Sequence, residues 1–137
     1  MIGQLPPFAL ATPTFRFKAL ASHAGRASLG GDREVALACF VSARLIAGLL
    51  PPLAIGSVDS SARATAAKQW LASLSVPSPT RTAATAAFDA VAGNNFKAAG
   101  KALKTLIEAG RAQLDQASIS EMTELVNELA DATLPAA

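Results

Sequence analysis

The chain has 137 residues, of which 51% are hydrophobic and only 16% are charged, and it contains one cysteine. This length predicts a single domain, and one cysteine excludes an internal disulfide framework. The low charge and a mean hydropathy of +0.34 favour a protein that buries surface against something besides itself. Abundant alanine and only 5% aromatic residues favour helices over strands. We therefore expect an all-α fold: an Ala-rich antiparallel helical bundle with one long apolar helix and an extended N-terminal arm.

The net charge of +2 hides a segregation of charges along the chain. Residues 1–31 contain no acidic residue, and residues 61–113 contain seven basic and two acidic residues. Residues 114–137 contain five acidic residues and no basic one. This pattern predicts either complementary faces within the molecule or two different docking faces.

Residues 1–31 are predicted to form the extended, basic arm. Prolines and glycines argue against a long helix, and the acid-free composition resembles that of an organellar transit peptide. The segment is either a loose terminus or an arm that a partner orders, and we favour the second interpretation because free tails seldom carry three phenylalanines. The candidate anchors are Phe8, Phe15 and Phe17, with Arg16 and Lys18 as the charges beside them.

Residues 32–137 are predicted to form a helical domain, and residues 32–56 are predicted to be its long apolar helix. Asp32 is the expected N-cap, and Pro51 should end the helix at about Leu50. The apolar stretch Val35–Gly56 is long enough to contact or cross a membrane, but Arg44 near its middle would be costly there. The alternative is a central core helix with Arg44 reaching the surface or paired with a carboxylate.

Shorter amphipathic helices are predicted over residues 57–131. They run from about Ser57 to Leu74, from Thr80 to Ala92, from Phe96 to Gly110 or Leu114, and from Ser118 onward. Short links between them imply antiparallel neighbours. The expected caps are Ser57, Asp59 or Ser60 for the first, Ser78 for the second, and a Ser118–Glu121 capping box for the last, with Gly93 closing the second helix. The expected inner faces, in chain order, are as follows: Ala62, Ala66, Trp70 and Leu74, beside Ala67 and Leu71; Ala84, Ala87, Phe88 and Val91; Phe96, Leu103, Leu106, Ile107 and Leu114, with Ala99 between them; and Ile119, Met122, Leu125, Val126 and Leu129.

The sequence offers few candidate residues for catalysis or metal binding. His23 is the only histidine and lies in the arm, where a catalytic group would lack rigid support. One Cys and one His do not supply the usual ligand sets of zinc or iron, and Cys39 fits an inert buried thiol. We expect no enzymatic activity, no metal and no cofactor.

Two charged helix faces are candidate partner-binding surfaces. Lys97, Lys101 and Lys104 share one face of a predicted helix, and they could contact phosphate or anionic lipid, pair with the last helix, or simply be solvated. A nucleic-acid module would need more arginine and a reading element, so we do not expect nucleic-acid binding. The acidic face of the last helix carries Glu121, Glu124, Glu128 and Asp131.

Residues 80–109 are similar to a tetratricopeptide-type helical pair: a helix, the Gly93–Asn95 turn, and a second helix with Phe96, Ala99 and Leu103. That resemblance implies peptide binding in a groove between helices, lined by the residues around Phe88 and Phe96. The period does not recur, and the signature aromatic of the first helix is missing.

These observations predict a non-enzymatic accessory or structural subunit that docks onto other subunits of a larger, membrane-bound complex. A membrane-associated or organellar location is expected rather than a free cytoplasmic one. The first alternative is a soluble helical adaptor that binds peptides in an interhelical groove. The second is a regulator that binds a small molecule in a cavity among the alanines.

Overall fold

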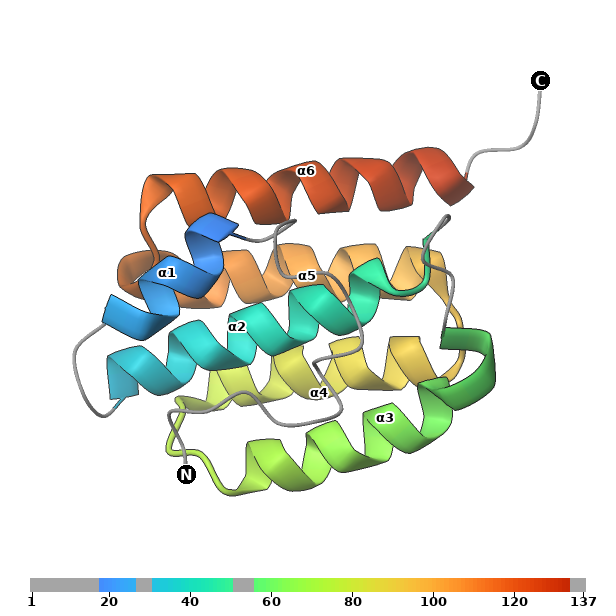
Figure 1. The fold of residues 1–137 in the computed structure, drawn as a ribbon, viewed down its shortest axis with the longest axis horizontal. Helices are drawn as coiled ribbons and strands as arrows, with labels where there is room; N and C mark the ends of the chain where they lie inside the picture. Colours follow the sequence, from blue (N-terminus) through green and yellow to red (C-terminus); the bar gives the residue numbers. More distant parts are fainter. Residues whose placement is uncertain (1–17, 27–30, 51–55, 134–137) are drawn as a thin grey trace.

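The computed structural model describes residues 18–26, 31–50 and 56–133. Within these ranges the chain forms six α-helices, one 3₁₀ turn and no strand, so the protein is an all-α helical bundle (Figure 1). The predicted anchors Phe8, Phe15, Arg16 and Phe17 lie outside the described residues. The elements are α1 (Lys18–Arg26), α2 (Gly31–Ala47), α3 (Gly56–Ala72), α4 (Ser78–Ala92), α5 (Phe96–Gly110), η3 (Arg111–Gln113) and α6 (Gln116–Thr133).

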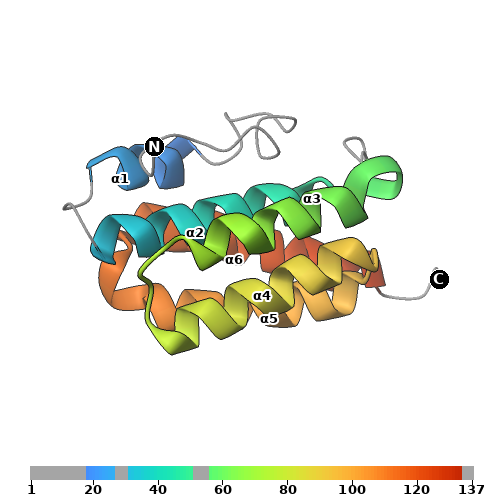
Figure 2. The ribbon, with the colours of Figure 1, turned by 90° about the horizontal axis from the view of Figure 1, so that it is seen from below.

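Helix α2 is the centre of the bundle. It contacts α1, α3, α4, α5, η3 and α6, and every residue from 34 to 50 is buried (Figures 1 and 2). A helix that is apolar on all sides must be covered on all sides, which explains why the other helices surround this segment. Of the helices in the described ranges, none has both the length and the apolar content that a membrane span needs.

The bounds of α2 differ from the prediction at both ends. The helix starts at Gly31, so Asp32 lies in its first turn and is not the N-cap. It ends at Ala47, three residues before Leu50, and the backbone N–H groups of Leu49 and Leu50 donate to the carbonyls of Ile46 and Ala47 in a tighter turn. Pro51 cannot follow a regular helical residue without steric conflict, and the chain therefore leaves the helix before it. The predicted continuation through residues 51–55 lies outside the described residues.

Part of the predicted arm is a helix. Residues Lys18–Arg26 form α1, which lies across α2 and α6 and buries Leu20 and Ala24 (Figure 2). The prediction of an extended conformation for residues 1–31 is therefore wrong for this segment. A short helix is marginal alone, and contacts with α2 and α6 supply the stability that local propensity does not.

Helices α3 to α6 follow one another as packed neighbours joined by short links, as predicted. The predicted face of α3 is displaced: Ala64, Ala67, Leu71 and Leu74 are buried, Trp70 is half-buried and Ala62 is exposed. Side chains of the proposed caps Ser57, Asp59 and Ser60 are not described. The predicted inner face of α4 is confirmed, because Ala84, Ala87, Phe88 and Val91 are all buried.

Two of the predicted N-caps are replaced by other residues, whereas the predicted end of α4 at Gly93 is confirmed. Pro77, not Ser78, is the N-cap of α4 and makes no side-chain bond. Gly93 ends α4 as predicted, but with φ −93°, and the left-handed residue is Asn94 with φ 51°. Asn95 caps α5 by accepting the N–H of Ala98 (3.0 Å). Asp115 caps α6 by accepting the N–H of Ser118 (2.8 Å), so the predicted Ser118–Glu121 capping box is wrong.

Buried polar contacts fix the link between α3 and α4. The carboxylate of Glu34, on α2, accepts the N–H of Ser75 (2.8 Å). The Arg81 guanidinium donates to the carbonyls of Leu71 (2.9 Å) and Leu74 (2.5 Å), which satisfies carbonyls that the end of α3 leaves without helical partners.

Candidate functional site

A groove runs along the molecular surface between the exposed edges of the packed helices α5 and α6. The strongly amphipathic helix α5 buries Ala99, Leu103, Leu106 and Ile107, which orients it on the bundle and leaves the opposite side in solvent. Its neighbour α6 buries Met122, Leu125 and Leu129. The two helices meet along these faces, and the groove follows the line where their exposed edges diverge.

The first part of this groove, here called the lysine groove, has a volume of about 270 Å³. Its lining combines apolar side chains with cations. The residues are Phe96, Lys97, Gly100, Lys101 and Lys104 from α5, with Val126, Leu129 and Ala130 from α6.

Two small residues create the hollow. Gly100 has no side chain, and a Cβ placed on it would lie 3.6 Å from the Leu129 Cβ, which is an ordinary contact distance. Ala130 on the facing helix also contributes only a methyl group. The half-buried ring of Phe96 and the half-buried methyl groups of Val126 therefore line a trough that another side chain can enter.

The three lysines stand on one wall of the groove. Lys97, Lys101 and Lys104 are exposed, and within the described residues none has a carboxylate within 4.0 Å. Although α5 and α6 are neighbours, the predicted pairing of these lysines with the acidic face of α6 is therefore not formed. The wall has three positive charges beside an apolar floor.

A continuation of about 250 Å³ extends the groove past Lys104. It is lined by Ile107, Glu108 and Arg111 on one side and by Thr123, Val126 and Asn127 on the other. Arg111 donates a hydrogen bond to Glu108 (2.8 Å). This bond and the positive charges of Arg111 and Lys104 hold the pKa of Glu108 below its ordinary value. The excess positive charge is thus confined to the lysine groove.

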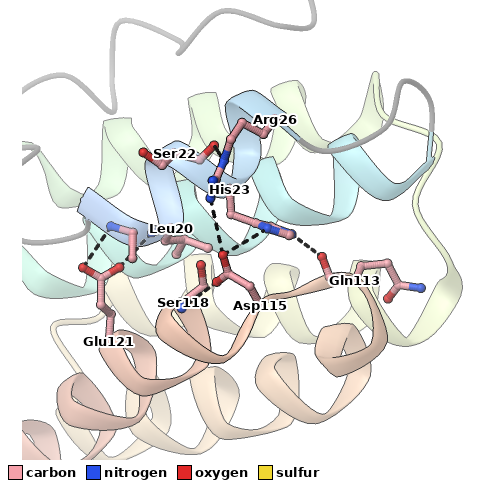
Figure 3. Close-up of polar contacts among 9 residues, drawn as sticks. Leu20, Ser22, His23, Arg26, Gln113, Asp115, Ser118 and Glu121 are labelled. Carbon is pink, nitrogen blue, oxygen red and sulfur yellow. Dashed lines mark hydrogen bonds and ion pairs between the residues drawn. The ribbon is translucent and has the colours of Figure 1, made fainter.

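The predicted acidic face of α6 is divided between two roles. Glu121 is half-buried, and its carboxylate accepts the backbone N–H groups of Leu20 (2.8 Å) and Ala19 (3.2 Å) at the start of α1 (Figure 3). A carboxylate at a helix N-terminus satisfies free N–H groups and the helix dipole together. Glu121 therefore anchors α1 within the molecule, whereas Glu124 and Glu128 are exposed.

A second polar cluster holds the other end of α1. His23 places Nε2 2.5 Å from the Gln113 carbonyl oxygen and Nδ1 3.4 Å from the Asp115 carboxylate, which Arg26 also approaches at 3.6 Å (Figure 3). Ser118, whose backbone N–H donates to this carboxylate (2.8 Å), holds the pKa of Asp115 below its ordinary value together with His23 and Arg26.

This cluster does not have the geometry of a catalytic triad. In a triad the imidazole lies between the carboxylate and the hydroxyl nucleophile. Here Asp115 lies between His23 and Ser118, and the second ring nitrogen of His23 faces a backbone carbonyl (Figure 3). Within the described ranges, no three His, Cys, Asp or Glu side chains converge as metal ligands.

Arg44 and Lys18 complete the predicted site residues. Arg44 is 0% exposed in the middle of α2, with its guanidinium 5.4 Å from the centre of the Phe40 ring. Burial lowers the pKa of this guanidinium from its ordinary value. Lys18 is exposed at the first residue of α1, far along the chain from the lysine groove.

The structure places Phe96, but not Phe88, on a groove. Phe88 is 0% exposed, so the groove predicted around both residues does not exist at that position. The sequence reasoning did not select Gly100, Val126 and Ala130 as site residues. Their only signal is a pair of small residues on two helices, and its meaning depends on which helices pack together.

Comparison of the chain with protein-family models, curated proteins and solved structures finds no match.

Proposed function

We propose that this protein is a non-enzymatic accessory subunit that docks onto another protein of a larger complex through the lysine groove. The observation that carries the proposal is the combination of an open apolar floor with three exposed lysines that have no carboxylate partner in the described residues. Exposed apolar patches with a polar rim are typical of interaction surfaces.

The dimensions of the groove favour a side chain of another protein over a small molecule. Small-molecule sites usually enclose about 300–1,000 Å³ and bury most of the ligand. The lysine groove holds about 270 Å³ and is partly open to solvent. It suits one or two anchoring side chains that bring a larger surface with them, and such anchors dominate protein interfaces.

The adaptor alternative is favoured by one specific observation, namely that Phe96 lines the groove as an adaptor would require. An adaptor exchanges partners and is a stable monomer between them, whereas an accessory subunit remains in its complex. The expectation of a membrane-bound host complex rests on composition, and fractionation with an alkaline carbonate wash tests it separately.

The test is the size of the native assembly. The full chain, tagged and expressed at its natural level, should elute from gel filtration well above its 13.9 kDa mass. Gly100→Leu fills the groove and should move the protein to the monomer position, whereas Gly100→Ala should not. Elution of the unaltered protein as a free monomer would contradict the accessory-subunit role.

A further inference from the structure

We infer that the occupant of the lysine groove is an acidic amphipathic helix of a partner protein. This inference rests on the proposed docking function and specifies the chemistry of the partner. Three features support it: the length of the groove along α5, the placement of charge on one wall, and the absence of a matching surface elsewhere in the described chain.

The groove has the shape that receives a helix. The two hollows share Lys104 and Val126, so they lie next to each other, and together they are lined from Phe96 at the start of α5 to Arg111 just after its end. At 1.5 Å per residue this line is about 22 Å long, or four helical turns. Two antiparallel helices with a trough between them offer a third helix the packing of a bundle, with apolar side chains at every third or fourth position as anchors.

The charge on the groove indicates an acidic partner. Lys97, Lys101 and Lys104 recur once per turn on the α5 wall, whereas the α6 residues that line the groove are uncharged. A helix lying in the trough can place carboxylates at the same interval along one flank and meet each lysine. Electrostatic complementarity of this kind selects among partners and raises the association rate.

A second copy of this chain does not provide that surface among the described residues. Exposed carboxylates occur on α6 at Glu124, Glu128 and Asp131, but the largest apolar residues of α6 are buried in its own bundle: Met122, Leu125 and Leu129. Asp89 on α4 is already paired with Lys68. No helix in the described ranges presents exposed acids beside a row of exposed large apolar residues, and we therefore assign the acidic helix to another protein.

The test uses a defined probe. A fluorescein-labelled 15-residue helical peptide, with leucine at heptad positions and glutamate along one flank, is titrated with the full-length protein and followed by fluorescence anisotropy. The same peptide with every glutamate replaced by glutamine, and a scrambled peptide of equal composition, are the ligand controls. We expect at least tenfold weaker binding of both control peptides, and weaker binding of the acidic peptide at high salt.

Protein variants locate the binding. Lys101→Glu should weaken the acidic peptide at least tenfold, and Gly100→Leu should abolish binding by filling the trough. Gly100→Ala is the matched control, because a methyl group there meets only an ordinary contact, and it should retain binding. Equal binding by the scrambled peptide, or no effect of either groove variant, would overturn the inference.

Other occupants give different outcomes. Sedimentation with phosphatidylglycerol vesicles but no peptide binding would assign the groove to a lipid surface. A dimer in sedimentation equilibrium that Gly100→Leu dissociates would assign it to a second copy. If a large native assembly dissociates with Gly100→Leu but the acidic peptide does not bind, the docking function stands and the acidic-helix inference fails. If the native protein is a monomer while the acidic peptide binds, the accessory-subunit role fails, whereas the groove still binds an acidic helix as an adaptor would.

Discussion

Two glycines of α5 give a matched test of the packing that positions the groove. A Cβ on Gly110 would lie 3.2 Å from Val35 Cγ1 and 3.4 Å from Cys39 Sγ, both in the buried part of helix α2. A Cβ on Gly100 would meet only Leu129, at 3.6 Å. The substitution Gly→Ala is therefore crowded at one position and unhindered at the other.

The magnitudes follow from these distances. Overpacking a buried site costs roughly 1–3 kcal/mol, and replacing glycine by alanine within a helix gains about 0.5–1 kcal/mol. Gly110 is the last residue of α5, with φ −103°, and recovers little of that gain. We expect Gly110→Ala to lower the free energy of unfolding by about 1–2 kcal/mol and Gly100→Ala to raise it by about 0.5–1 kcal/mol.

Urea denaturation followed by circular dichroism measures both changes, and Tm should fall for Gly110→Ala and rise for Gly100→Ala. Equal stabilisation by the two substitutions would refute the close approach of α5 to α2. Because that close approach orients α5 on the bundle, the same result would also contradict the placement of the α5 lysines on the groove.

Three further predictions concern the attachment of α1 and the core. Glu121→Ala should destabilise the protein by about 1–2 kcal/mol and speed amide exchange in α1, whereas the exposed Glu124→Ala should change stability by less than about 0.5 kcal/mol; equal effects would contradict the anchor. The folded-state pKa of Asp115 lies below its unfolded value of about 3.9, so its carboxylate stabilises the fold above about pH 4, and this contribution is lost as pH falls through the folded pKa. The stability difference between the unaltered protein and Asp115→Asn should therefore be largest near neutral pH and shrink in acid. A difference independent of pH would refute the stabilising role of this carboxylate. Burial raises the pKa of the Cys39 thiol to about 12, so Ellman's reagent at pH 8 should label it only after unfolding; labelling of the native protein would show that α2 is accessible.

The sequence predicts the helical elements because hydrophobic periodicity and turn residues are local signals. The spacing of Ala84, Ala87, Phe88 and Val91 determines the buried face of α4, and the Gly93–Asn95 turn determines where α4 ends. These features need no knowledge of which helices meet.

The errors occur where tertiary contacts decide. Glu121 has the sequence position of a capping-box residue, but it bonds the start of α1, about 100 residues earlier in the chain. Residues 18–26 carry weak helical signals and fold because Leu20 and Ala24 are buried against α2 and α6.

The candidate site shows the same division. The shared face of Lys97, Lys101 and Lys104 follows from helical spacing, but the hollow beside them does not. It requires Gly100 on α5 to face Leu129 and Ala130 on α6, and that juxtaposition exists only when the two helices pack.

The most direct measurement of the central claim is site-specific photo-crosslinking in native cells. The photoreactive residue p-benzoylphenylalanine replaces Lys101 in the lysine groove or, as the matched control, the exposed Thr65 on α3. The docking proposal predicts one protein adduct from position 101 that disappears when Gly100→Leu is added, and no such adduct from position 65. Adducts from position 65 alone, or an adduct from position 101 that survives Gly100→Leu, would contradict the lysine groove as the docking surface.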